Sequence, residues 1–294
     1  MDDRRIIKDR NKLTGKDWAE RILLALLFII NGSLIMIVFS PWRPLLEGLP
    51  DYLGRIALIA LLLISVLLVR KSNKSHKYWQ VIYGLLVLII AVSLDWVIAR
   101  VLIDYLGLND STPAGWALMK LNDCIVIVSV VIIMTKIGGS KLNTIFIQKG
   151  NLKIGLLIGF GAFALAVIGS FPMAALFDAR DLTLARITPW IPWILIFVLS
   201  NAAMEEILFR GLFLNKLTPF FGKILSNVLV ALVFTILHNG AGYTVDQMIF
   251  LAILFPLALV WGYVMQKTDA VWGSILFHAG MDIPIILGIF SNRF

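Results

Sequence analysis

Charged residues and cysteines are both scarce in this chain. Only 15% of its 294 residues are charged, whereas 60% are hydrophobic. A soluble domain carries about 25% charged residues, so this chain has too few to cover a water-facing surface. The single cysteine, Cys124, cannot form an intrachain disulfide. The sequence also has no zinc-finger spacing and no glycine-rich nucleotide-binding motif. This composition excludes an ordinary soluble globular protein, a disordered chain and a small disulfide scaffold.

Long continuous apolar runs recur along the whole chain. Each is about 15–20 residues long, which is typical of a membrane helix and not of an alternating barrel strand. Because hydrocarbon requires backbone polar groups to be paired within the segment, the sequence predicts an all-α, polytopic membrane helical bundle. We expect about nine transmembrane helices, with eight as the alternative count. The expected spans are residues 22–40, 53–69, 79–99, 121–135, 153–171, 188–210, 223–239, 246–266 and 270–290.

The distribution of basic residues predicts the orientation in the membrane. The net charge is +8, and residues 1–21 form a basic leader. If the N-terminus is inside, most of the 26 Lys and Arg residues fall in cytoplasmic segments, as the positive-inside rule requires. We therefore expect an integral protein of the lipid bilayer, in a bacterial cell membrane, with a cytoplasmic N-terminus and no nucleic-acid partner. The sequence does not predict an oligomeric state.

A polar, glycine-containing segment near residues 137–152 divides the chain into two expected parts. Residues 1–150 hold the cytoplasmic leader and four transmembrane helices. Residues 151–294 hold five more helices and are expected to form the catalytic bundle.

Several ionisable residues lie inside apolar sequence in the second part. Each costs a few kcal/mol near the bilayer centre, so each is expected to have a partner or a function. In the densest group, Glu206 and Arg210 are four residues apart and share a helical face, which predicts an ion pair. Glu205 points about 100° away from Glu206 and has no such local cation, although Asn201 shares its side. Glu205 is thus the carboxylate left free for chemistry.

Two of the three histidines also lie in expected spans. His238 follows Phe234 by one helical turn, and His278 and Asp282 form another pair four residues apart. A carboxylate and a neutral histidine together can hold and deprotonate a water molecule. The candidate catalytic residues are Glu205, Glu206, Arg210, His238, His278 and Asp282.

These three motifs, in this order on successive hydrophobic segments, resemble those of the CPBP (CAAX protease and bacteriocin-processing, Abi) family of intramembrane proteases. The resemblance covers roughly residues 185–290. It implies a peptide-hydrolysing centre that opens toward the cytoplasm. It also implies that Glu205 and His238 act as the general base, and that His278 and Asp282 stabilise the oxyanion. The last position is often Asn in the family, so Asp282 either orients His278 or donates a hydrogen bond when protonated.

The cofactor and the substrate stay open at this stage. Glu205, His238 and His278 equal a Glu/His₂ zinc site in composition, so a zinc mechanism is the alternative to a metal-free, glutamate-based mechanism, which we favour. The expected substrate is a membrane-embedded or lipid-modified peptide or protein. In a bacterial host the substrates would be peptide pheromones, bacteriocins or membrane regulators.

Two other functions compete with proteolysis. One is a non-catalytic membrane scaffold, or a bacteriocin-immunity or regulatory protein, that keeps the motifs as a structural network. The other is a proton-coupled transporter in which Glu, His and Asp relay protons. The absence of an evident inverted repeat weighs against the transporter.

Overall fold

The computed structural model describes residues 15–294, which form helices and no strands, so the predicted all-α fold is confirmed. Most of the predicted basic leader lies in residues 1–14, outside the described part. Within that part, eight helices are long and apolar enough to cross a membrane. In chain order the elements are α2 (Gly15–Val38), α3 (Gly48–Lys71), η2 (His76–Tyr78), α4 (Trp79–Leu94), η3 (Asp95–Ala99), α5 (Arg100–Tyr105), α6 (Pro113–Ile137), η4 (Leu142–Ile145), α7 (Leu152–Ala174), η5 (Ala175–Phe177), α8 (Leu184–Ile187), η6 (Thr188–Trp190), α9 (Ile191–Glu205), η7 (Glu206–Gly211), α10 (Leu212–Leu237), α11 (Gln247–Thr268) and α12 (Trp272–Arg293).

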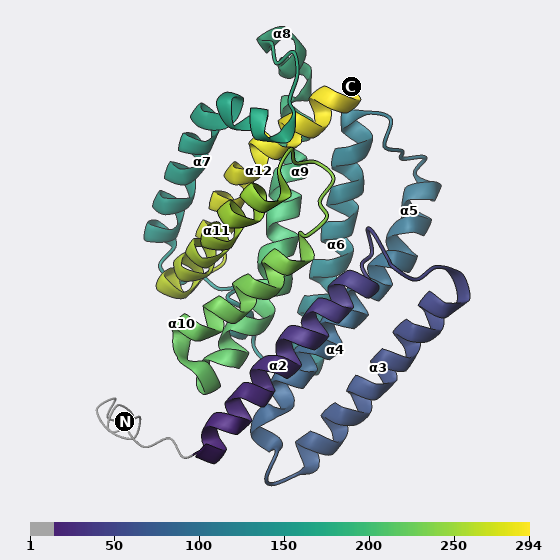
Figure 1. Ribbon diagram of the computed structural model, residues 1–294, viewed down its shortest axis with the longest axis vertical. Coiled ribbons are helices and arrows are strands. Elements are labelled where there is room, and N and C mark those ends of the chain that lie inside the picture. The colour runs from purple at the N-terminus through teal and green to yellow at the C-terminus, as the bar shows by residue number, and fades with distance from the viewer. Residues whose placement is uncertain (1–14) are drawn as a thin grey trace.

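The difference between eight and nine helices arises at Gly222. One helical run of 54 residues, Leu184–Leu237, contains both of the expected spans 188–210 and 223–239. A straight helix of this length would measure about 80 Å, far more than the ~30 Å hydrocarbon core. Gly222 breaks the run with φ 72° and ψ 173°, a conformation that favours glycine. The chain doubles back within α10, as Figure 1 shows, so each of the nine expected spans is helical.

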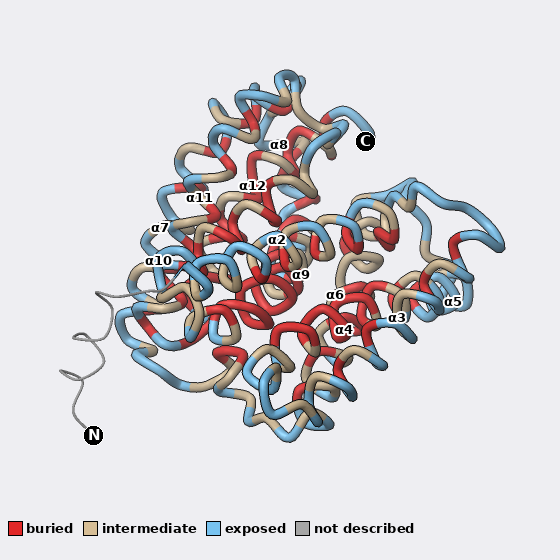
Figure 2. The backbone as a smooth tube through the Cα atoms, turned by 60° about the horizontal axis from the view of Figure 1, so that its bottom comes forward, coloured by how far each residue is buried: buried red, intermediate tan, exposed pale blue. Residues whose placement is uncertain are grey.

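The core lies where the central helices meet, and the outer helices turn leucine and isoleucine side chains outward. In α4 the residues from Leu85 to Ile89 are all buried. By contrast, Ile56 on α3 and Leu157 on α7 are 63% and 73% exposed. Figure 2 shows this pattern, with buried segments at the centre and exposed ones on the outer helices. In a membrane these apolar side chains face lipid, so the outward pattern fits an integral membrane bundle.

Helices α7 and α12 pack with their backbones almost touching. A Cβ atom on Gly273 would lie 2.5 Å from the carbonyl oxygen of Gly155, and one on Gly280 would lie 2.7 Å from the Cα of Phe163. Near the end of α12, a Cβ on Gly288 would meet Phe177 at 2.6 Å. Small residues at such positions let membrane helices approach closely. The resulting α7–α12 pair forms one wall of the region that holds the polar cluster described next.

Candidate active site

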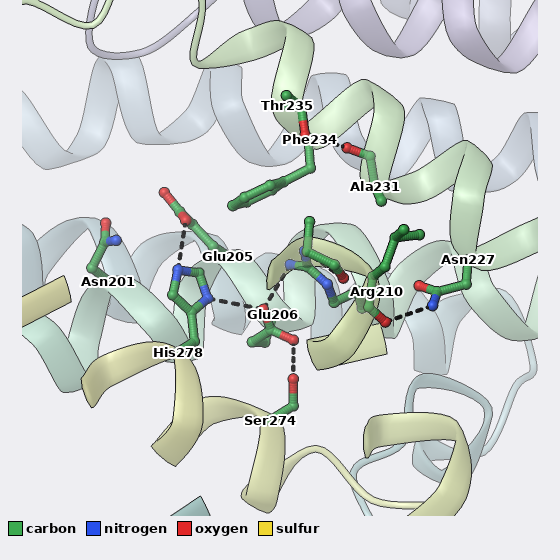
Figure 3. Close-up of polar contacts among 12 residues, drawn as sticks. Asn201, Glu205, Glu206, Arg210, Asn227, Ala231, Phe234, Thr235, Ser274 and His278 are labelled. Carbon is green, nitrogen blue, oxygen red and sulfur yellow. Dashed lines mark hydrogen bonds and ion pairs between the residues drawn. The ribbon is translucent and has the colours of Figure 1, made fainter. Parts of the chain in front are cut away.

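A fully buried ion pair lies at the base of the polar cluster. Arg210 Nη1 is 2.6 Å from Glu206 Oε1, and both side chains are 0% exposed. Ser274 on α12 donates to the other oxygen, Glu206 Oε2, and the Arg210 guanidinium carbon lies 4.4 Å from the Phe234 ring centroid. Figure 3 shows these contacts converging on Glu206. The predicted ion pair therefore forms, and it occurs in η7, where the helix widens into a π-turn of the kind often found at functional sites.

His278 is held by its ring face and by one nitrogen. Its imidazole stacks on the indole of Trp261, with centroids 3.9 Å apart and an angle of 11° between the planes. Nδ1 lies 2.9 Å from Glu206 Oε1. Because that carboxylate is paired with Arg210, it accepts the hydrogen bond and Nδ1 donates. The tautomer and the direction of Nε2 are thereby set.

Nε2 of His278 faces two further carboxylates. It lies 3.5 Å from Glu205 Oε2 and 3.6 Å from Asp282 Oδ1. A neutral His278 that donates through Nδ1 has a lone pair at Nε2, which would repel two ionised carboxylates. The three groups therefore need at least one proton among them. Such a shared proton is what a site for acid–base chemistry requires.

Glu205 and Asp282 differ in how they are held. Asp282 Oδ2 accepts a hydrogen bond of 3.0 Å from Asn201 Nδ2, which ties α12 to α9. Glu205 Oε2 is buried, yet it accepts no hydrogen bond from any described side chain or backbone group. Its contact with His278 is longer than a normal hydrogen bond. Glu205 therefore keeps an acceptor available to another molecule.

His238 lies beside this cluster and has no contact with its carboxylates among those that the structure gives. Its Nδ1 is 2.8 Å from the carbonyl oxygen of Phe234, so Nδ1 carries the hydrogen and Nε2 keeps a lone pair. Its ring centroid is 4.6 Å from that of Phe234, whose ring is also 5.9 Å from His278. One phenyl ring thus contacts both imidazoles, and His238 presents a neutral, accepting nitrogen.

An apolar cavity reaches the cluster from one side. Its volume is about 360 Å³, and Asp282 and Trp261, which both contact His278, form part of its wall. Phe250, whose ring centroid is 6.2 Å from that of His238, forms another part. Ligand sites are commonly apolar pockets with a few convergent polar groups, and this cavity has that character.

The ligand set of the alternative zinc mechanism, Glu205, His238 and His278, is not assembled around one point in the described residues. A catalytic zinc site needs three protein ligands around one point. Among residues 15–294, no group of three or more His, Cys, Asp or Glu side chains is arranged to hold a metal ion. Both nitrogens of His278 face carboxylates, and His238 directs Nδ1 at a backbone carbonyl.

Sequence reasoning missed two residues of this cluster. Ser274 precedes His278 by four residues, as His278 precedes Asp282, so one face of α12 carries all three. That spacing is a sequence signal that could have identified Ser274 as part of the site. Trp261 had no such signal, because a tryptophan in an apolar span is as readily a lipid-facing or packing residue.

Comparison with known proteins places these residues in one domain. Residues 187–284 match the family model described as Type II CAAX prenyl endopeptidase Rce1-like. The matched segment runs from the end of α8 into α12, so it contains all six candidate catalytic residues. The match confirms the resemblance to the CPBP proteases. No curated protein and no solved structure matches the chain.

Proposed function

We propose that this protein is an intramembrane endopeptidase that hydrolyses a peptide bond in a membrane-embedded or lipid-modified peptide or protein. One observation carries the proposal. Glu205 Oε2 is buried and accepts no hydrogen bond, and it lies beside His278 and Asp282, next to the wall of an apolar cavity. The Rce1-like domain, which belongs to a protease family, supports the reaction class.

In the proposed reaction Glu205 is the general base. A water molecule donates one hydrogen bond to Glu205 Oε2, and the accepting Nε2 of His238 orients it from the side of Phe234. As the water oxygen attacks the peptide carbonyl, its proton moves to Glu205. The same proton then passes to the leaving nitrogen, so that the C–N bond breaks and an amine and a carboxylic acid form. General acid–base catalysis of this kind contributes about 10²–10⁴-fold.

His278 and Asp282 serve the developing oxyanion in this proposal. The protonated Nε2–H of His278 is the donor, and it is directed into the site because Nδ1 is fixed by Glu206 and the ring by Trp261. Asp282, held by Asn201, lies 3.6 Å from Nε2, and its carboxylate orients the protonated imidazole by electrostatic attraction before substrate binds. Donors fixed in a site that excludes water stabilise an oxyanion strongly. Of the two roles that the sequence left open for Asp282, this geometry favours orientation of His278.

Glu206 and Arg210 are positioning residues. They are fully buried, and Glu206 already accepts from Arg210, Ser274 and His278. A carboxylate with three donors is a poor proton acceptor for a water molecule. Their part is to fix His278 and the π-turn that carries Glu205 at its edge.

The decisive experiment compares the membrane peptides of cells that express the wild type with those of cells that express Glu205→Gln. We expect cleavage products to disappear while the variant stays folded and inserted. Glu47→Gln is the matched control, because Glu47 is an exposed loop residue whose side chain caps nothing. A phenotype that survives Glu205→Gln supports a scaffold or immunity protein instead. Proton-coupled uptake in proteoliposomes supports a transporter.

A further inference from the structure

The apolar cavity lies in one half of the bundle only. It is bounded by the end of α7 and η5, by residues 244–246, by the first part of α11 and by the middle of α12. Asp282, its innermost polar residue, is ten residues into α12, about 15 Å from the start of that helix. The cavity therefore extends from mid-depth toward the end of the bundle where the loop 238–246 lies, the upper end in Figure 1.

The other end of the bundle is closed by hydrogen bonds between two connecting segments. The backbone N–H of Val271 donates to the carbonyl of Phe146, and that of Asn151 donates to the carbonyl of Thr268. Side chains add two more bonds, from Gln148 to Asp269 and from Trp272 to Gln148. Beneath the cluster, Ser274, Glu206 and Arg210 are 0% exposed. The lining of the apolar cavity includes no residue of these connecting segments.

The closed end is also the basic end. Four turns lie at this end, near residues 72–78, 138–151, 215–223 and 267–271. Contacts join them: Tyr78 stacks on Phe220 with ring centroids 5.3 Å apart, Asn215 donates to the carbonyl of Thr144, and Gln266 donates to the carbonyl of Lys223. These turns carry most of the Lys residues in the described part of the chain, namely Lys71, Lys74, Lys77, Lys136, Lys141, Lys149, Lys153, Lys216, Lys223 and Lys267. The positive-inside rule assigns such turns to the cytoplasm.

Loops at the cavity end have the opposite character. The backbone N–H of Val245 donates to the carbonyl of Leu176, and Arg43 donates to the carbonyl of Gly240. The segments at this end carry no lysine; their acidic residues are Glu47, Asp110, Asp178, Asp181 and Asp246, and their basic residues are Arg43, Arg180 and Arg186. Cavity and basic turns are therefore at opposite ends of one bundle.

We propose that the substrate enters from the non-cytoplasmic face, between α11 and the α7–α12 pair, and that its class is a peptide with an apolar segment exposed on that face. This differs from the cytoplasmic opening that the family resemblance implies. That the entering molecule is a substrate rests on the proposed function. The direction of access rests only on the position of the cavity and on the distribution of Lys and Asp residues between the two ends. The cavity walls are almost entirely apolar, so an apolar side chain or a hydrocarbon chain of the substrate occupies the cavity. The peptide bond then lies beside Asp282 and Glu205.

The direction of access is tested by labelling, which requires no activity. In a Cys124→Ala background, which removes the only cysteine, single variants Gly242→Cys and Asn73→Cys are treated in intact cells with a membrane-impermeant maleimide. Gly242 lies in the loop at the cavity mouth and a Cβ there meets nothing within 4 Å, while Asn73 is exposed in the basic turn. We expect at least tenfold stronger labelling of Gly242→Cys, and equal labelling of both after permeabilisation. The reverse pattern in intact cells overturns the proposal.

A second arm tests whether this cavity is the entrance. Thr244→Cys places a thiol on the rim, and its modification with a bulky impermeant reagent should reduce cleavage at least tenfold. In permeabilised membranes, where both thiols react, the same treatment of Asn73→Cys should leave cleavage within twofold. Full cleavage by labelled Thr244→Cys overturns the proposed route. Absence of cleavage by the unlabelled wild type, in cells and in detergent, rejects the protease function while the labelling result still decides sidedness.

Discussion

The imidazole of His278 lies almost flat on the indole of Trp261, 3.9 Å away and inclined by 11°. The two residues come from neighbouring helices, α12 and α11, and Trp261 is 1% exposed. With Nδ1 fixed by Glu206, this stacking leaves the imidazole one orientation, in which Nε2 faces Glu205 and Asp282. The position of α11 therefore controls the geometry of a residue on α12.

Replacing Trp261 tests this control. An aromatic pair contributes about 0.5–1.5 kcal/mol beyond burial, so Trp261→Leu should lower kcat by about 2–10-fold through misorientation of His278. Trp261→Phe keeps an aromatic face and should retain most of the activity. The measurement is kcat and KM on a model peptide. An effect on KM alone would show that Trp261 serves only the cavity wall.

Replacing one member of the buried ion pair should destabilise the protein more than replacing both members. Arg210→Met leaves Glu206 buried without its cation, and such changes cost about 3–5 kcal/mol. The double variant Glu206→Gln with Arg210→Met should recover part of that loss, because no uncompensated charge remains. Thermal unfolding in detergent measures both. Equal stability of the single and double variants would contradict a structural role for the pair.

Loss of the hydrogen bond from Asn201 to Asp282 should lower the rate of cleavage more than it lowers the stability of the fold. Asn201→Leu removes one half-buried hydrogen bond, which costs about 0.5–1.5 kcal/mol of stability. We expect kcat to fall about tenfold and its pH profile to change, because Asp282 no longer holds the His278 N–H in place. Asp282→Asn should add little in the Asn201→Leu background, since residues that act together are not additive. Fully additive losses would argue for independent roles.

Chelation should leave the proposed cleavage activity intact. The described side chains do not bring three ligands together, and the proposed water activation uses Glu205 and His238. After treatment with EDTA and gel filtration, cleavage should stay within twofold of the untreated enzyme. Elemental analysis of the same sample provides the metal content. Loss of cleavage that zinc restores would overturn the metal-free mechanism.

Two glycine substitutions test how closely α7 and α12 pack against each other. Gly273→Ala introduces a Cβ at 2.5 Å from a backbone oxygen, so we expect a loss of about 1–3 kcal/mol. Gly161→Ala, on the partner helix α7, has nothing within 4 Å of its Cβ and should be neutral or stabilising. Thermal unfolding of the two variants in detergent separates the effect of helix contact from that of helix propensity. Equal losses of stability would show that the loss at Gly273 does not come from its contact with α7.

Much of the fold could be predicted because span length and charge are local properties. The apolar runs predict the helical segments, and the spacing of Glu206 and Arg210 predicts their ion pair. The described residues contain eight helices of membrane length, the alternative count, because Gly222 reverses the chain without ending the helical run. A single glycine between Phe221 and Lys223 carries little sequence signal for a turn.

The site was predictable as a set of residues but not as an arrangement. The four-residue spacing along α12 predicts which of its side chains share a face. It does not predict the hydrogen bond between Glu206 on η7 and His278 on α12. The π-turn at Glu206 also changes the direction of side chains that ideal α-helical spacing assigns. The placement of His238 relative to His278 depends on Phe234, whose ring contacts both imidazoles through packing alone.

The backbone contacts between α7 and α12 have a consequence for motion. Because α12 touches Gly155 and Phe163 of α7 and Phe177 of η5, we expect these segments to move together while α11 changes the width of the cavity. Pro256 in the middle of α11 lacks the N–H that would bond to the preceding turn. We therefore expect the first half of α11 to tilt outward and admit a chain while the second half, with Trp261, keeps the imidazole of His278 in place.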